Sequence, residues 1–242
     1  MNTSDLLRQR FVALQQEFGS MVTPEPSKIR IEVPLKEGVG QYRFDIKKIV
    51  DNLREQSLDR NDVFVPNYMG VMFGFQKPEH PQTMSLYPYA PVVGEYFVAQ
   101  EGFLSDDANA LYNGQLTLQI DNTMILNSYP TENFKHVPEE QGCVILDGEQ
   151  TLVNIGIQPE FTIKDACELV IPRILIAGTR DIKFIVNFDG AGLTFDAADG
   201  VGESATALTP VLVFYMDGFL LKNGCEKGIG VKETVAPVVG NW

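Results

Sequence analysis

The chain of 242 residues has few of the side chains that carry most catalytic, redox and metal chemistry. It contains two histidines and three cysteines, and the cysteines are Cys143, Cys167 and Cys225. No Cys-x-x-Cys pair occurs, and an odd number of cysteines in a chain of this length does not indicate a disulfide framework. We therefore expect reduced, buried thiols in a protein that assembles in the cytosol.

Long apolar runs and an excess of positive charge are also missing. No run of roughly 18 apolar residues occurs, so the sequence predicts no membrane-spanning helix, and the polar N-terminus lacks the order of a signal peptide. The formal net charge is −13. This charge argues against a protein that wraps nucleic acid, because such binding depends on Lys and Arg at phosphates. We expect no sequence-specific nucleic-acid partner.

The negative charge is unevenly distributed along the chain. Residues 1–60 contain 10 basic and 9 acidic residues, whereas the rest of the chain contains 9 basic and 23 acidic residues. An asymmetric particle with a near-neutral N-terminal end and an acidic body is one interpretation. The other is the solubility of an ordinary acidic protein, since net charge governs solubility more directly than fold.

Sequence patterns of known catalytic and metal sites are absent as well. His80 and His136 stand in no His-x-x-x-His or Glu-x-x-His pattern, and we expect both to be solvated loop residues. No Gly-x-Ser-x-Gly elbow or Walker loop occurs, and Cys143 is expected to be an inert buried thiol. The sequence predicts a protein that is not an enzyme, with no catalytic, cofactor-binding or metal-binding residues.

Acidic clusters are the other candidate ion-binding sites. Ser105–Asp107 and Asp196–Asp199 could bind calcium weakly through loop oxygens, although they lack the spacing of an EF-hand. Turn formation is the favoured interpretation, because Asp and Asn stabilise turns. A carboxylate pair of the glycosidase kind is a third, less favoured alternative.

The first segment has the periodicity of an amphipathic helix. Ser4 can cap this helix, Asp5 lies in its first turn, where negative charge is favourable, and Gly19 follows as a stop. Its apolar residues recur at helical spacing: Leu6, Leu7, Phe11, Leu14 and Phe18. Residues 20–27 include two prolines and predict an extended linker.

After this linker the alternation of apolar and polar residues favours strands. Ile29, Ile31 and Val33 predict a half-buried antiparallel strand, and Asp121-Asn122 predicts a tight turn between two others. About a dozen short strands separated by turns are expected along the chain. Such a pattern is typical of a sandwich or a barrel.

Two local predictions concern the direction of side chains. A strand that contains Ile182 and Phe184 should bury both on one face and place Ile185 on the other. A short helix is expected over residues 47–57, with its apolar side chains facing inward: Ile49, Val50 and Leu53.

Aromatic residues are concentrated in one third of the chain, where they are mixed with prolines and methionines. They are Tyr68, Phe73, Phe75, Tyr87, Tyr89, Tyr96 and Phe97. A long aromatic connection between strands can pack as core under a loop, or it can pack against a neighbouring subunit. Both alternatives stay open at this point.

The overall plan resembles that of a viral capsid subunit of the jelly-roll kind. The plan consists of an amphipathic helix, a proline linker and many short strands, of which Leu111–Phe134 and Ile174–Phe188 are the most typical. More narrowly, it is similar to a compact double jelly-roll major capsid protein of tailless icosahedral phages with an internal membrane, such as those that infect flavobacteria. The resemblance implies a mainly β chain with an N-terminal helix and linker at residues 1–27. Two antiparallel jelly-roll sandwiches would stand side by side, at residues 28–137 and 138–242.

The resemblance also implies a function without catalysis. The chain would be a structural virion protein, a homotrimeric capsomer of pseudo-hexameric outline in an icosahedral capsid that assembles in the host cytoplasm. Its partners would be its own copies, neighbouring capsomers, and penton or minor capsid proteins. The helix would touch an internal membrane peripherally, with Arg8 and Arg10 toward anionic headgroups or an acidic neighbour.

A binding module is the alternative from a different class. In a carbohydrate- or receptor-binding β-sandwich of a phage fibre or an adhesin, exposed aromatic residues between positions 87 and 97 would stack on sugar rings.

Overall fold

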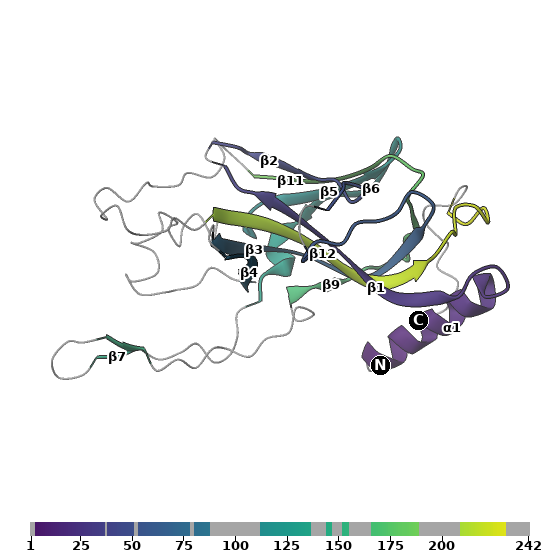
Figure 1. Ribbon diagram of the computed structural model, residues 1–242, viewed down its shortest axis with the longest axis horizontal. Helices are drawn as coiled ribbons and strands as arrows, with labels where there is room; N and C mark the ends of the chain where they lie inside the picture. Colours follow the sequence, from purple (N-terminus) through teal and green to yellow (C-terminus); the bar gives the residue numbers. More distant parts are fainter. Residues whose placement is uncertain are drawn as a thin grey trace.

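The computed structural model describes residues 3–36, 38–50, 53–77, 80–87, 112–136, 144–146, 152–154, 166–188 and 209–230. These residues form one α-helix, one short 3-10 helix and antiparallel strands, so the prediction of a mainly β chain with an N-terminal helix is confirmed (Figure 1). The elements are α1 (Thr3–Phe18), β1 (Pro24–Pro34), β2 (Gln41–Phe44), β3 (Val63–Lys77), β4 (His80–Tyr87), β5 (Gln115–Ile120), β6 (Thr123–Pro130), η1 (Thr131–Phe134), β7 (Val144–Leu146), β8 (Leu152–Asn154), β9 (Glu168–Leu169), β10 (Ile176–Ala177), β11 (Ile182–Asn187) and β12 (Thr209–Leu221).

Two sheets pack face to face in this part of the chain. One sheet has the order β1-β12-β3, and the short strands β10, β9 and β4 pair with successive stretches of the long strand β3. The other sheet has the order β2-β11-β5-β6. In Figure 1 the second sheet lies above the first, and α1 lies below it at the right-hand end.

The strands pair in a nested order. The first strand β1 pairs with the last strand β12, and β2 pairs with β11. Further in, β3 pairs with β9 and β10, and β5 pairs with β6. The chain therefore resembles one long hairpin that has been folded over to make two layers.

This nesting corrects the predicted division of the chain. The prediction placed one sandwich at residues 28–137 and a second at residues 138–242. Strands of the first segment instead pair with strands of the second, and both contribute to one hydrophobic core. The division is therefore wrong for the strands of the two facing sheets, which form a single sandwich, while β7 and β8 pair only with each other.

Buried and more exposed side chains alternate strictly along β11, so that one face of the strand lines the core of the sandwich. On β11, Ile182 and Phe184 are buried while Ile185 is half-buried on the other face, so the predicted side-chain directions are confirmed. The rings of Phe184 and Phe44 lie 4.4 and 5.3 Å from the ring of Phe214 on β12. These three aromatic side chains join the two layers at the centre of the core. The predicted tight turn is also confirmed, since Asp121 has a φ of 52° between β5 and β6.

The predicted proline linker is wrong for its second half, because Pro24 and Pro26 belong to β1. On this strand the N–H and C=O of Arg30 bond to Gln56 and not to β12. Residues two apart on a strand point the same way, so both prolines occupy positions whose missing N–H would face away from β12. They are tolerated because β1 is an edge strand.

Helix α1 is part of the body of the protein. Its residues Leu14 and Phe18 are buried in a second apolar cluster on the outer face of the β1-β12-β3 sheet, and the ring of Phe11 lies 5.5 Å from that of Phe219. The apolar periodicity of the helix was predicted correctly. Its separation from the sandwich by a linker was not, because the helix covers side chains that alternation turns outward, among them Val63.

A β-bulge helps to hold this helix. The pairing of β3 with β12 shifts at Asn67, which adds one residue to β3 and changes the phase of its side chains. Arg10 of α1 donates hydrogen bonds to the Asn67 Oδ1 at 3.4 Å and to the Val170 carbonyl oxygen at 2.8 Å. Burial lowers the pKa of Arg10. The guanidinium is thus directed into its own chain, contrary to the predicted orientation toward headgroups.

Candidate functional site

The segment 45–58, of which the structure describes residues 45–50 and 53–58, follows β2 and exposes three large apolar side chains. It begins at Asp45 and runs back along the free edge of β1. Two backbone hydrogen bonds of 2.9 Å join Gln56 to Arg30, and the Leu58 N–H donates to the Ile46 carbonyl oxygen at 2.6 Å. The segment is therefore fixed to the sandwich near its start and its end.

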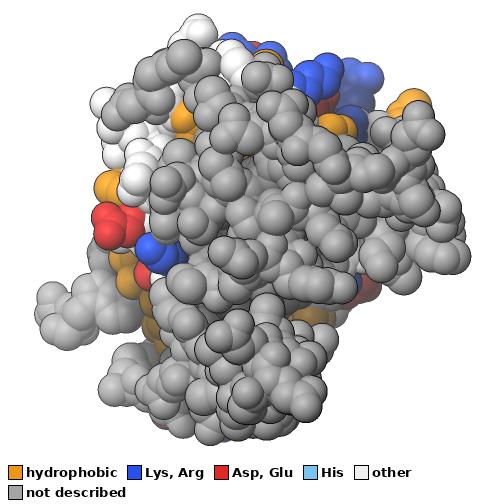
Figure 2. All heavy atoms as spheres, turned by 90° about the vertical axis from the view of Figure 1, so that its left-hand side faces the viewer, with side chains coloured by type: hydrophobic (Ala, Val, Ile, Leu, Met, Phe, Trp, Pro, Cys, Tyr) orange, Lys and Arg blue, Asp and Glu red, His pale blue; other side chains and the backbone are white. Residues whose placement is uncertain are grey.

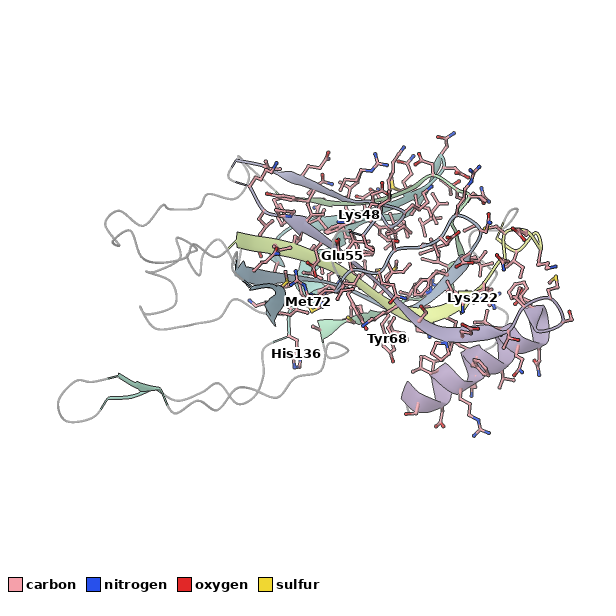
Figure 3. All side chains as sticks on the ribbon, in the orientation of Figure 1. Lys48, Glu55, Tyr68, Met72, His136 and Lys222 are labelled. Carbon is pink, nitrogen blue, oxygen red and sulfur yellow. The ribbon has the colours of Figure 1, made fainter. Side chains whose placement is uncertain are left out.

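Buried charges fix the middle of the same segment. The Glu32 carboxylate on β1 accepts hydrogen bonds from Arg54 at 2.8 and 3.1 Å and from Arg30 at 3.0 Å. The Glu55 carboxylate accepts the backbone N–H of Glu32 at 2.9 Å and forms an ion pair with Lys48. Figure 3 shows Lys48 and Glu55 side by side at the middle of the molecule.

The electrostatics of this cluster favour ionised carboxylates. Burial raises the pKa of Glu32, but hydrogen bonds from Arg54 and the charges of Arg30 and Arg54 outweigh that effect and leave the pKa below its ordinary value. Buried charges are tolerated only when they are paired and hydrogen-bonded. The cluster meets this condition, so it can anchor the segment through charge.

The apolar side chains of the segment point the other way. Ile49 and Leu53 are 90% and 89% exposed, and Val50 is also exposed. The prediction of an inward-facing helix over residues 47–57 is wrong: the described residues of this range form turns and a bridge. The apolar spacing fits a helix, but Lys48, Arg54 and Glu55 turn into the protein and leave the apolar residues outside.

An open hollow lies beside this segment on the same surface. Its volume is about 350 Å³, and it is lined by Pro26, Ser27, Lys28, Gln56 and Asp217. Leu53 is three residues from Gln56, so their Cα atoms lie within roughly 10 Å of each other.

The residues considered as catalytic or metal sites do not converge in the described structure. His80 begins the strand β4, and not a loop, while His136 is half-buried after η1. Cys167 and Cys225 are half-buried free thiols. Cys143, Ser105–Asp107 and Asp196–Asp199 lie outside the described residues. Within the described ranges no group of three or more His, Cys, Asp or Glu side chains could hold a metal ion.

The aromatic segment is only partly described. Tyr68 is buried on β3, and burial raises its pKa while the charge of Arg10 opposes this rise. Phe73, Phe75 and Tyr87 belong to β3 and β4, and the remaining three residues, Tyr89, Tyr96 and Phe97, lie outside the described residues. Every aromatic side chain whose burial is described is buried or half-buried. No exposed aromatic ring therefore occurs among the residues whose burial is described.

The charge of the chain is divided sharply between described and undescribed residues. The described residues include 17 basic and 14 acidic ones, and the others include 2 basic and 18 acidic ones. Figure 2 shows Lys and Arg side chains gathered along its upper edge, on the side of the β2-β11-β5-β6 sheet. The described residues are thus close to neutral, and most of the negative charge of the chain lies outside them.

Of the residues described, none form a helix that is long and apolar enough to cross a membrane. Comparison with protein-family models, with curated proteins and with solved structures found no match to this chain.

Proposed function

We propose that this chain is a structural subunit of a viral capsid and that its sandwich is a jelly-roll. The nested strand pairing carries this proposal. In a jelly-roll, two Greek keys arise when a long antiparallel hairpin folds into two facing sheets, and the architecture is common in capsid and lectin domains. The orders β1-β12-β3-β10 and β2-β11-β5-β6 fit that description.

The exposed apolar side chains support assembly as the purpose of this sandwich. A soluble monomer gains nothing from placing Ile49 and Leu53 in water while it buries the charged groups next to them. The arrangement becomes favourable when another protein surface covers the apolar side chains. A shell of many subunits supplies such a surface, and it needs no catalytic residues.

The proposed assembly is a homotrimer, or a larger ring, of single sandwiches. A trimer has a pseudo-hexameric outline when each subunit contributes two sandwiches, and the described strands contribute one. We therefore retain trimeric capsomers, contact with neighbouring capsomers and location in the virion as parts of the proposal. Arg8, which is exposed on α1, is the basic residue left for a contact with an anionic surface.

Electron microscopy of the purified full-length chain tests this proposal. We expect rings or closed particles, and we expect sedimentation to show species well above the monomer mass. The carbohydrate-binding alternative predicts instead a compact monomer with saturable glycan binding that Tyr87→Ala or Tyr89→Ala abolishes. A monomeric protein with that behaviour would overturn the capsid proposal.

A further inference from the structure

We propose that the hollow beside Asp217 binds one neutral sugar residue of a glycan, and that the Asp217 carboxylate accepts hydrogen bonds from the hydroxyl groups of this sugar. The inference goes beyond the proposed function, because it adds a ligand site to a subunit that would otherwise only assemble. In a capsid, such a site would attach the particle to a surface that carries glycans.

The hollow is a gap between two apolar clusters on the outer face of the β1-β12-β3 sheet. Phe219, Asp217 and Tyr215 lie two residues apart on β12 and therefore point to the same side of the sheet. The ring of Phe219 packs against Phe11 of α1, and Tyr215 belongs to an apolar cluster against which Cys167 packs. Asp217 between them is half-buried and lines the hollow. The face thus leaves a carboxylate accessible between two apolar clusters.

The surroundings of Asp217 strengthen its hydrogen bonds. Asp217 lies directly opposite Lys28 of β1 and Tyr68 of β3. Burial is the main cause of the raised pKa of Tyr68 and of the raised pKa of Tyr215, which reaches about 12, and the negative charge of Asp217 adds to both. Two neutral, buried phenol rings therefore lie close to the carboxylate. A hydrogen bond is electrostatically stronger in such low-dielectric surroundings than in water.

The groups that line the hollow fit hydroxyl groups better than charged groups. The Asp217 carboxylate is an acceptor, and the Gln56 amide is both an acceptor and a donor. The Ser27 hydroxyl and the Lys28 ammonium group add donors. A sugar hydroxyl donates one hydrogen bond and accepts others, so it can use this mixed set. The opposite charges of Lys28 and Asp217 cancel, so the lining has no net attraction for an ion.

The size and the rigidity of the hollow suit one sugar residue. Its volume of about 350 Å³ lies near the lower end of the usual range for small-ligand sites. Gln56 is held by two backbone hydrogen bonds of 2.9 Å to Arg30, and its side-chain amide lies 3.4 Å from the Ser27 hydroxyl. The other residues of the lining belong to the paired strands β1 and β12. A site that is formed in advance needs little ordering when the ligand binds.

An open hollow of this kind should bind a single sugar weakly, with a dissociation constant in roughly the millimolar range. A shell of many subunits would present the hollow many times, and multivalent attachment can raise the overall affinity by roughly 10²–10⁴. This gain rests on the proposed function, whereas the binding of a sugar to a single chain does not.

Saturation-transfer nuclear magnetic resonance with the full-length protein tests the inference. The probes are the methyl glycosides of glucose, galactose, mannose and N-acetylglucosamine, and at least one should bind saturably. Asp217→Asn should weaken this binding about tenfold or more, because it removes a charged hydrogen-bond acceptor. Gln56→Ala, which removes an exposed side chain and keeps the backbone bonds, should weaken it roughly two- to tenfold. Asp5→Asn, at an exposed carboxylate of α1, is the matched control and should leave it unchanged.

Two further probes test the class of ligand. Methyl glucuronide should bind no better than methyl glucoside, because the hollow has no net charge, and a free sugar should bind no better than its methyl glycoside. The opposite order in the first pair would contradict a neutral ligand, and in the second pair it would contradict a glycan. If no neutral glycoside binds, or if binding survives both Asp217→Asn and Gln56→Ala, the inference is wrong and the capsid proposal stands.

Discussion

The outer faces of the two sheets differ although their strands pair in the same nested way. On the β1-β12-β3 sheet, outward side chains such as Val213, Tyr215 and Leu221 are buried, and α1 covers one end of the face. On the β2-β11-β5-β6 sheet, most outward side chains are polar and half-buried or exposed: Gln41, Arg43, Gln115, Thr117, Gln119, Lys183 and Asn187. In the first sheet the central strand β12 is apolar on both sides, whereas the edge strand β1 carries Lys28, Arg30 and Glu32 on its outer side; the strands β5 and β11 of the second sheet alternate.

This difference shows how much a strand sequence says about its surroundings. Alternation in β5 and β11 matches one buried and one open face, whereas the unbroken apolar run from Val211 to Met216 in β12 matches burial on both faces. The covered face and the open face should therefore respond differently to substitution. Four predictions, from the largest effect to the smallest, test this comparison.

The largest effect is expected between the sheets. Phe184→Ala should lower the free energy of unfolding by roughly 3–5 kcal/mol, because it removes a buried ring that contacts Phe214. Denaturant unfolding measures this loss. Ile185→Ala, on the open face of the same strand, is the control and should cost far less. A loss below about 1 kcal/mol for Phe184→Ala would place its strand at the surface.

The covered face should be nearly as sensitive. Leu14→Ala removes a buried side chain between α1 and the sheet, so it should cost roughly 2–5 kcal/mol. Val12→Ala, on the exposed side of the same helix, should stay within about 0.5 kcal/mol. Deletion of residues 1–20 should lower the melting temperature but leave a cooperative transition, since the larger core contains no residue of α1. If Leu14→Ala and Val12→Ala have the same free energy of unfolding, helix α1 does not pack against the sheet.

The ion pairs of Glu32 with Arg30 and Arg54, at the edge of the covered face, should make a pH-dependent contribution to the free energy of unfolding. Glu32→Gln should cost roughly 1.5–3 kcal/mol at neutral pH, because its hydrogen bonds join charged groups. The folded-state pKa of Glu32 lies below its ordinary value of 4.5. The stabilisation is therefore fully present above pH 4.5 and is lost as the pH falls through the lower, folded-state pKa.

Thermal melts of wild type and Glu32→Gln between pH 7 and strongly acidic pH measure this term. The gap between the two melting curves should narrow on the acidic side. Glu17→Gln, which changes an exposed carboxylate, is the control and should show a small gap throughout. A gap that widens as the pH falls would contradict the assigned direction.

The smallest effect is expected for the exposed ion pair that joins α1 to the loop before β10. Arg173 lies 2.8 Å from Glu17, and the Glu17 side chain is well exposed to solvent. Arg173→Ala should therefore cost roughly 0.2–1 kcal/mol, and added salt should remove most of that difference. A larger loss at high salt would mean that the arginine also packs against apolar groups.

Local features were predictable from the sequence to the extent that neighbouring residues determine them. The helix α1, the faces of β11 and the turn at Asp121 follow from periodicity and turn chemistry. The pairing of β1 with β12 joins residues nearly the whole chain apart. No local pattern specifies such a partner, and this is why the division into two sandwiches failed.

The candidate site was missed for a related reason. Ile29, Ile31 and Val33 predict a half-buried strand, and the residues between them, Arg30 and Glu32, would then lie on its solvent-facing side. Apolar residues 49, 50 and 53 have helical spacing, so they were assigned to a core. The structure shows the opposite for both groups. Arg54 and Glu55 form hydrogen bonds with Glu32 on β1, so the charged residues are buried and the apolar residues of the segment are exposed. An excess of charged residues beside an apolar triplet was the only signal in the sequence.

Native mass measurement of the full-length protein over a range of concentrations tests the central claim most directly. If the subunits are built to meet copies of themselves, the dominant species should weigh three times the chain mass of 26.9 kDa or more. A single species of one chain at every concentration would contradict the account.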